Sequence, residues 1–285
     1  MKLIRFGQKG AEKTGVVING MYYDTSSFGQ DYNEAFFHND GLSALQEFIG
    51  KHKGQLPVVS QNERIASPVA RPSKIVCVGL NYEKHAIETN APIPLEPVLF
   101  IKSATSLSGP YDDIILPPGS VKTDWEVELA LVIGKETRYV SEDDAFDYVA
   151  GYCLHNDVSE REYQLERGGT WDKGKGCDSF APLGPWFVTK EEIPDVNNLR
   201  LWLKVNGKIF QDGNTNDLIF NIPALISYIS KFMTLLPGDI VSTGTPHGVG
   251  IGFSPPKFLQ EGDVVELGID GLGVSRQRVK RYSSR

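Results

Sequence analysis

Acidic side chains recur at every second position near the start of the stretch TDWEVELALVIG. If this stretch is a β-strand, Asp124, Glu126 and Glu128 share one face, because successive side chains on a strand point to opposite faces. The same face then turns apolar with Ala130 and Val132, so the rest of the strand is expected to be buried on both faces. Carboxylates crowded where such a strand enters the core repel one another strongly, and a divalent cation removes that repulsion.

A second predicted strand, GYCLHND, ends in another acid, Asp157. If the two strands are neighbours, Asp157 joins Glu126 and Glu128 in a cluster that offers only oxygen ligands. Such a cluster favours Mg²⁺, Mn²⁺ or Ca²⁺ over Zn²⁺, and three carboxylates with open coordination positions suit Mg²⁺ or Mn²⁺. We therefore predict that these three residues hold Mg²⁺ or Mn²⁺. His155 lies two positions before Asp157 and is expected on the same face of the strand. It either supports the metal site or, as is more usual for such a histidine, has only a structural role.

A histidine and a glutamate lie three residues apart just after the predicted strand KIVCVG. In a helical turn formed by YEKHAIE, His85 and Glu88 occupy positions i and i+3, so their side chains can meet. A carboxylate bonded to one imidazole nitrogen fixes the tautomer and raises the basicity of the other nitrogen. The pair predicts a general base for a water molecule, although His–Glu pairs of this kind are also common on protein surfaces.

Further candidate residues lie after Asp157 and in two glycine-rich segments. Arg161 and Gln164 are also three positions apart, one turn beyond Asp157, so they can project toward the same place. The glycine-rich segment that follows carries Lys173 and Lys175, each of which is expected, taken alone, to be solvated. The loop STGTPHGVGIG contains glycines that permit a close approach of the backbone to a ligand, but it has no nucleotide-binding motif.

The composition of the chain excludes several classes of partner. The chain has 285 residues and a formal net charge of −7, and it has no run of basic residues beyond its short C-terminal tail, so we expect no nucleic-acid partner. No apolar stretch approaches the length of about 20 residues that a membrane span needs, and the first residues are too polar for a signal peptide. Three cysteines without CxxC spacing fit a reducing compartment. The sequence therefore predicts a cytoplasmic protein without a membrane partner.

Residues 1–69 are predicted to form a small N-terminal α/β domain. Short strands flank Asn19–Gly20, which is the signature of a type I′ hairpin turn. The segment GLSALQEFIGKH then has the apolar spacing of a helix. The two prolines of SPVARPSKI mark the end of this unit.

Residues 70–285 are predicted to form the main, strand-rich domain. Asn206–Gly207 is a second hairpin turn, and Asn221 can cap the helix that begins PALISYI. Residues 158–167 are predicted to form a polar helix. The expected fold class is α+β with a predominance of strands.

Taken together, these motifs resemble the fumarylacetoacetate hydrolase family. The matching segments cover about residues 73–280 in family order, and they are GLNYEKHAIE, EPVLFIK, DWEVELALVIG, the run from Asp157 through Arg161 to Gln164, GKGCDSFAPLGPW, LWLKVNG and LLPGDIVSTGTPHGVG. The resemblance implies a mixed β-roll catalytic domain behind a small N-terminal domain, a homodimer, and Mg²⁺ or Mn²⁺ acting on a 1,3-dicarbonyl or 2-oxo acid substrate.

The resemblance also implies a role for nine residues. Glu126, Glu128 and Asp157 would be the metal ligands, and His85 with Glu88 would be the dyad that activates water. Lys175 would contact the reacting oxyanion. Arg161, Gln164 and Thr245 would bind the substrate.

The implied activity is hydrolysis of a carbon–carbon bond in a β-diketo acid, either a 2,4-diketo-3-deoxy sugar acid or an acylpyruvate, to pyruvate and a second acid. The alternative is a lyase of the same family, such as a ureidoglycolate lyase, an oxaloacetate decarboxylase or a 2-oxo-3-deoxy sugar-acid dehydratase. A more remote alternative is a metal-stabilised binding module without catalysis. Such a module needs the three acids but not His85, Glu88 and Lys175.

Overall fold

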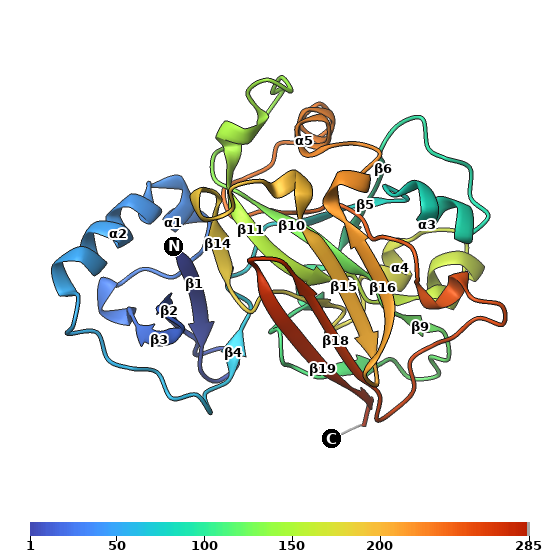
Figure 1. The fold of residues 1–285 in the computed structure, drawn as a ribbon, viewed down its shortest axis with the longest axis horizontal. Coiled ribbons are helices and arrows are strands. Elements are labelled where there is room, and N and C mark those ends of the chain that lie inside the picture. The colour runs from blue at the N-terminus through green and yellow to red at the C-terminus, as the bar shows by residue number, and fades with distance from the viewer. Residues whose placement is uncertain (284–285) are drawn as a thin grey trace.

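A large mixed β-sheet runs through the length of the molecule and carries the candidate site (Figure 1). The computed structural model describes residues 1–283. The strands follow the spatial order β3, β2, β1, β14, β11, β10, β17, β5 and β6, and β4 pairs with β1 beside this path. Their bounds are β1 Lys2–Phe6, β2 Lys13–Ile18, β3 Met21–Asp24, β4 Ile65–Ala66, β5 Ile75–Gly79, β6 Val98–Lys102, β10 Val127–Ile133, β11 Val149–Asn156, β14 Phe187–Thr189 and β17 Ile240–Ser242.

A second, five-stranded sheet packs against the large one and has the order β16, β15, β18, β19 and β8 (Figure 1). Its strands are β8 Ile114–Leu116, β15 Arg200–Val205, β16 Lys208–Asn214, β18 Val264–Ile269 and β19 Gly273–Arg281. Two short ladders complete the strands, and they join β9 Thr123–Asp124 to β12 Ser159–Glu160, and β7 Leu107–Ser108 to β13 Ala181–Pro182.

Strand β10 lies at the centre of the molecule, and all seven of its residues are buried. One of its faces contributes Leu129 to an apolar cluster with Leu203 of β15, where the two sheets meet. Its other face contributes Ala130 to a second cluster, which includes Phe100 of β6 and Cys153 of β11. The prediction that this strand is buried on both faces is confirmed. Any polar side chain on it must therefore find its partners inside the protein.

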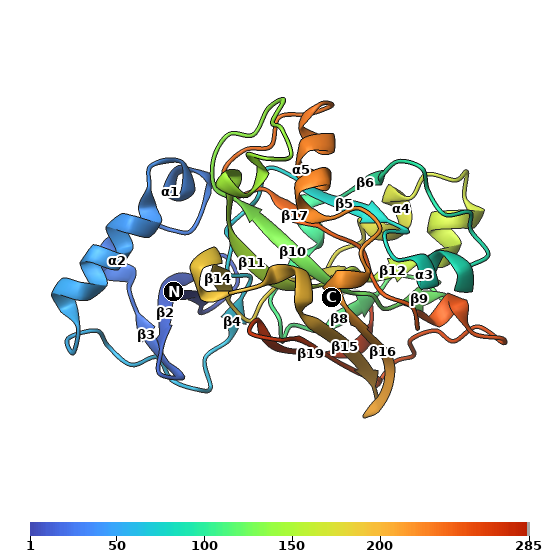
Figure 2. The same ribbon diagram turned by 45° about the horizontal axis from the view of Figure 1, so that its top comes forward.

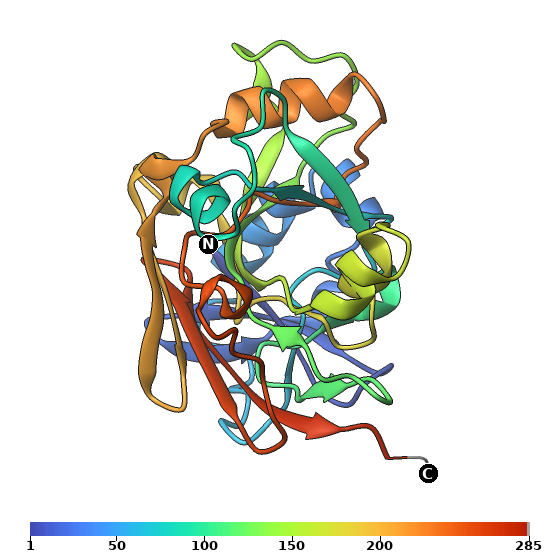
Figure 3. The ribbon, with the colours of Figure 1, turned by 90° about the vertical axis from the view of Figure 1, so that its right-hand side faces the viewer.

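Helices lie at the edges of the sheets. Their bounds are α1 Glu34–His38, α2 Gly41–His52, α3 Glu83–Glu88, α4 Asp172–Lys175 and α5 Ile222–Ser230. Helices α1 and α2 lie at the end of the molecule that holds the N-terminus, and α3 and α4 lie at the opposite end (Figures 1 and 2). Seen from that opposite end, α3 and α4 flank the central strands from two sides (Figure 3). Within residues 1–283, no helix has both the length and the apolar character needed to cross a membrane.

Local sequence signals placed several turns and caps correctly. Both predicted hairpin turns have positive φ at their two central residues, with 51° and 77° at Asn19 and Gly20 and 52° and 78° at Asn206 and Gly207. Positive φ at both positions is what a type I′ turn requires. The side chain of Asn221 accepts a hydrogen bond from the backbone N–H of Ala224 and caps α5, as expected.

The predicted helix over residues 158–167 is wrong in its first part. Ser159 pairs with Asp124 in the short β12–β9 ladder, and only Glu162–Glu166 form a helical turn, which is of the π type. The sequence window is polar in both cases, so its pattern does not reveal a ladder partner that lies more than 30 residues earlier in the chain.

The N-terminal strands continue the main sheet. Strand β1 lies beside β14 (Figure 1) and pairs with it antiparallel. In this register Leu3 lies opposite Phe187. The division of the chain into residues 1–69 and 70–285 stays a prediction, and its boundary falls in the segment between β4 and β5.

Candidate active site

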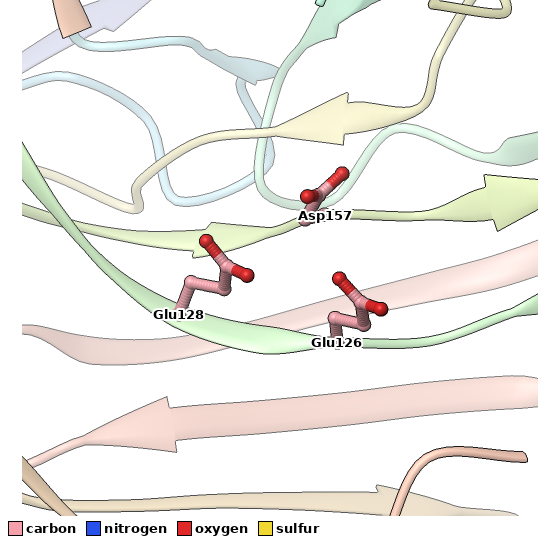
Figure 4. Close-up of side chains that lie close together, drawn as sticks. All are labelled: Glu126, Glu128 and Asp157. Atoms are coloured by element: carbon pink, nitrogen blue, oxygen red, sulfur yellow. The ribbon is translucent and has the colours of Figure 1, made fainter. Parts of the chain in front are cut away.

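Three carboxylates meet near the first residue of β10 and the last residue of β11. The two strands are antiparallel, with Glu128 opposite His155, and the backbone N–H of Asp157 donates to the carbonyl of Glu126 at 2.9 Å. This register places Glu126, Glu128 and Asp157 around one point, with a ligand oxygen of each within 4.8 Å of the others (Figure 4). None of the three side chains is more than 4% exposed. The predicted cluster therefore exists, and it is fully buried.

Three cationic side chains surround two of these acids. The ammonium of Lys175 lies 2.6 Å from Glu126 Oε2 and 2.9 Å from Asp157 Oδ2. Lys102 Nζ is 2.5 Å from Asp157 Oδ1, and Arg161 Nη2 is 2.7 Å from Glu126 Oε1. Burial alone raises the pKa of both carboxyl groups. The neighbouring cations outweigh burial and lower both pKa values, so Glu126 and Asp157 are ionised.

Glu128 has a different environment from its two neighbours. Its carboxylate accepts hydrogen bonds from the hydroxyl of Ser242 and, at 3.2 Å, from the backbone N–H of Gly244. In the part of the chain that the structure describes, no lysine or arginine forms an ion pair with it. Burial, followed by the negative charges of Asp157 and Glu126, raises its pKa well above the usual value. Among the three acids of the cluster, Glu128 is thus the one without a cationic partner.

His155 supports this arrangement through Ser242. Its Nδ1 lies 2.7 Å from the hydroxyl oxygen of Ser242, and that hydroxyl donates a hydrogen bond to the carboxyl group of Glu128. The serine oxygen therefore accepts the Nδ1–H of the imidazole, which fixes the tautomer. Burial lowers the pKa of His155 to about 3, so the ring is neutral. His155 therefore positions Ser242 through a hydrogen bond, and Ser242 positions Glu128 through another.

The predicted dyad forms at the end of α3. His85 Nδ1 lies 2.9 Å from Glu88 Oε1, and the other carboxylate oxygen of Glu88 accepts the backbone N–H of Gly248 at 2.8 Å. A carboxylate can only accept, so Nδ1 carries a proton, and in the neutral ring the lone pair lies on Nε2. The loop that follows β17 therefore fixes Glu88, and Glu88 fixes the ring of His85.

Arg161 is held by three oxygen acceptors. Its guanidinium donates to Asp124 Oδ2 at 2.9 Å, to Gln164 Oε1 at 3.0 Å and to Glu126. Asp124 also accepts the backbone N–H of Gly250 at 2.6 Å. Asp124 lies beside Glu126, because the same guanidinium bonds both carboxylates, but it is not one of the three clustered acids. Asp124 instead positions Arg161.

The last predicted residue, Thr245, lies in the loop after β17. Its hydroxyl donates to the carbonyl of Val127 at 2.9 Å and accepts from the side-chain amide of Gln211 at 2.8 Å. These two bonds tie the loop to β10 beside the acids.

A cavity of about 380 Å³ joins these groups, and eight of the nine predicted residues line it. Asp157 is the exception and lies behind the wall, in contact with Lys175 and Lys102. The lining residues are Val78, Gly79, Leu80, His85, Glu88, Thr89, Asn90, Ala91, Phe100, Glu126, Glu128, Arg161, Gln164, Leu165, Trp171, Lys175, Thr245 and Ile251.

Comparison with known proteins identifies the family. Residues 74–280 match the family described as "Fumarylacetoacetate (FAA) hydrolase C-terminal". The chain belongs to the fumarylacetoacetate hydrolase family. The predicted family and the strand-rich α+β fold class are therefore confirmed.

Full-length relatives of this family include both hydrolases and an isomerase. A Burkholderia ambifaria protein that is provisionally named a hydrolase is 50% identical over 282 residues, which cover 98% of this chain and 99% of the relative. The crystal structure of maleylpyruvate hydrolase from Sphingobium sp. SYK-6, in complex with manganese(II) and pyruvate, is 32% identical, with a TM-score of 0.83 and coverage of 99% of this chain and 100% of that one. The 2-hydroxyhepta-2,4-diene-1,7-dioate isomerase from Mycobacterium marinum is 31% identical, with a TM-score of 0.75 and coverage of 100% of both chains.

Lys102 is a residue that the sequence analysis missed in this member of the fumarylacetoacetate hydrolase family. It ends β6 in the run VLFIK, two positions after the buried Phe100, so both side chains point inward. A lysine on the buried face of a strand is unusual, and this parity was the available signal. The residue could have been flagged as the partner of a buried acid.

Replacing Lys102 with methionine should lower the free energy of unfolding by about 3 kcal/mol. Breaking a buried ion pair leaves an uncompensated charge, and the value lies at the lower end of the usual range because Asp157 keeps Lys175. Urea denaturation measures the change. The control is Lys51→Met, because Lys51 pairs with Glu47 on the exposed surface of α2, and this substitution should leave the midpoint unchanged. Equal midpoints for the two variants would contradict the prediction.

Proposed function

We propose that this chain is a divalent-metal-dependent hydrolase that cleaves a carbon–carbon bond of an acylpyruvate-type β-diketo acid. The products would be pyruvate and a second acid. The observation that carries the proposal is that the His85–Glu88 dyad and two acids of the cluster, Glu126 and Glu128, line the same cavity. The relation to maleylpyruvate hydrolase, which was crystallised with manganese(II) and pyruvate, supports it. A cytoplasmic homodimer and a 2,4-diketo-3-deoxy sugar acid as a second substrate candidate belong to the same proposal.

The residues present suit a divalent cation. Glu126, Glu128 and Asp157 would hold the ion, because each offers a carboxylate oxygen within 4.8 Å of the others. The all-oxygen donor set suits Mg²⁺ or Mn²⁺, and Glu128 has no cationic partner that would compete with the ion. Lys175, which now pairs with Glu126 and Asp157, would then be free to face the substrate. When bound, the ion would act as a Lewis acid and template for the 2-oxo acid end of the substrate.

The protein groups supply the proton transfer and the charge stabilisation. His85 takes a proton from water at its free Nε2, while Glu88 holds the ring in that tautomer. The water oxygen adds to the distal carbonyl carbon, and the ammonium of Lys175 stabilises the negative charge that develops on the carbonyl oxygen. The carbon–carbon bond then breaks, and its electrons stay on the pyruvate fragment, which leaves as an enolate and takes up a proton. Arg161, with Gln164 and Thr245, would orient the substrate.

Two other functions share parts of this site. A lyase or isomerase would use the same enolate, and the similarity to an isomerase keeps this class as the second candidate. A non-catalytic metal-binding module would need only the acids, and the presence of the His85–Glu88 dyad in the cavity favours an enzyme over it.

Product analysis tests the proposal. The purified protein is incubated with acetylpyruvate and Mg²⁺ or Mn²⁺, the loss of the enol absorbance is followed, and the products are identified. We expect pyruvate and acetate in equal amounts, and no reaction in EDTA. Release of carbon dioxide from oxaloacetate, without cleavage of acetylpyruvate, would move the protein to the decarboxylases. The absence of both reactions would overturn the proposal.

A further inference from the structure

The cavity has a charged floor and an almost uncharged mouth. Glu126, Glu128, Arg161 and Lys175 are at most 5% exposed, so they form the floor. Leu165 is 48% exposed and stands at the mouth. The partly buried or exposed lining residues between these two levels are, apart from Glu88, uncharged, and they are Gly79, Leu80, Thr89, Asn90, Ala91, Trp171 and Ile251.

Trp171 forms a fixed wall of this uncharged region. A Cβ atom added to Gly79 would lie only 2.4 Å from the indole, so the ring rests directly on the strand backbone at that glycine. The ring of Phe100 lies beside it, with 5.4 Å between the ring centroids. The next residue, Asp172, accepts the backbone N–H of Ile101 at 3.0 Å and ties the start of α4 to β6. These contacts place an immobile apolar surface next to the substrate's path to the floor.

The cationic groups of the cavity lining and of residues 161–175 all have partners. Among the residues that line the cavity, Arg161 and Lys175 are the two cationic side chains, and each lies within 2.9 Å of a carboxylate of the floor. Arg167, beyond the mouth, pairs with Glu162. Lys122 and Lys173 are held by Glu166 and by the carbonyl of Arg167, respectively. A carboxylate placed beside Trp171 would therefore meet no cation in the cavity lining that lacks a partner.

We propose that Trp171 and Leu165 form the subsite for the tail of the substrate and that this subsite selects an uncharged tail over one that ends in a second carboxylate. The proposal rests on the proposed function, because it takes the charged floor as the place of the 2-oxo acid end. Transferring an ionised group from water to an apolar wall without a partner is costly, whereas a methyl group gains from the same contact. The subsite thus narrows the substrate class to neutral acylpyruvates.

Two diketo acids of equal length test this selectivity. Butyrylpyruvate ends in a methyl group, and succinylpyruvate carries a carboxylate at the same position. With Mn²⁺ present, we expect kcat/KM for butyrylpyruvate to exceed that for succinylpyruvate at least about tenfold. Trp171→Ala should raise KM for butyrylpyruvate about tenfold or more and change kcat less, because the residue contacts the tail rather than the reacting atoms.

A designed charge should reverse the preference. Leu165→Arg supplies a cation at the mouth, on a side chain that is already half exposed, and should improve kcat/KM for succinylpyruvate relative to butyrylpyruvate at least about tenfold. Leu95→Arg is the matched control, because Leu95 is 96% exposed and does not line the cavity. The control variant should keep the wild-type ratio.

The outcomes separate the two proposals when binding is measured by calorimetry beside turnover. Equal kcat/KM for both compounds in the wild-type enzyme, or the same ratio in Leu165→Arg and Leu95→Arg, would overturn the tail selectivity and leave the hydrolase function standing. Preferential binding of butyrylpyruvate without cleavage would overturn the hydrolase function and support the selectivity. If neither compound binds or reacts, both proposals fall.

Discussion

Replacing His85 with alanine should reduce kcat by about 10²–10⁴-fold while leaving the affinity for Mn²⁺ within about twofold of the wild-type value. General-base catalysis contributes about this much to a rate, and the free Nε2 of His85 is the only lone pair of the dyad that can take a proton from water. The ring is bonded to Glu88 and not to the acidic cluster, so the cation site should not sense its loss. Steady-state assays at saturating Mn²⁺, together with calorimetric titration of Mn²⁺, measure both quantities.

Two further variants show whether the loss comes from the dyad. Glu88→Gln keeps the size of the side chain but can present an amide N–H to the imidazole, which favours the wrong tautomer, so we expect an intermediate loss of kcat. His38→Ala removes an exposed histidine of α1 and should leave kcat unchanged. If His85→Ala turns over like the His38 variant, the base is another group.

The parts of this site that the sequence predicted are those set by local geometry. His85 and Glu88 meet because i and i+3 positions face each other on any helical turn. Glu126 and Glu128 share a face because the strand alternates, and Asp157 joins them because β11 pairs with β10. Neither relation requires knowledge of distant segments, beyond the assumption that two strands adjacent in the chain are neighbours in the sheet.

The parts that the sequence did not reveal depend on segments far apart in the chain. Lys102 bonds Asp157, which lies 55 residues later in the chain, and the local sequence around either residue does not reveal its partner. Asp124 stays beside Glu126 but outside the group of three acids, and the partners that hold it, Arg161 and the backbone N–H groups of Gly250 and Ile251, lie far away in the chain. Lys175, taken alone, was expected to be solvated but is 2% exposed, because its two carboxylate partners come from β10 and β11.

Replacing Glu128 with glutamine should abolish the stabilisation by Mn²⁺ without destabilising the metal-free protein. The metal-free protein already favours the neutral form of this side chain, because burial and two neighbouring carboxylates raise its pKa well above the usual value. An uncharged amide of the same shape resembles that neutral form and is therefore expected to keep the melting temperature. A cation that needs all three acids would lose most of its affinity. Thermal denaturation with and without Mn²⁺ measures both effects.

The pH dependence of metal-free stability provides a second measurement of the same group. A raised pKa means that folded Glu128 holds its proton more tightly than the unfolded chain does. This contribution to stability is complete below the unfolded value of about 4.5 and is lost as the pH rises through the folded pKa. The metal-free wild-type protein should therefore lose more stability across that interval than Glu128→Gln, which has no such proton. Mn²⁺ competes with the same proton, so the affinity of the wild-type protein should increase with pH.

Glu160 offers a matched control for this substitution. It is as deeply buried as Glu128, but its carboxylate accepts from the hydroxyls of Ser120 and Thr123 and stands outside the cluster. Glu160→Gln replaces an acceptor with a partial donor, so it should destabilise the metal-free protein and yet keep the full shift of the melting temperature by Mn²⁺. We therefore expect Glu128→Gln to keep the metal-free melting temperature and lose the increase caused by Mn²⁺. We expect Glu160→Gln to lower the metal-free melting temperature and keep that increase. If Mn²⁺ still raised the melting temperature of Glu128→Gln, the cation would bind through ligands other than Glu128. The repulsion at this residue would then be relieved by its proton alone.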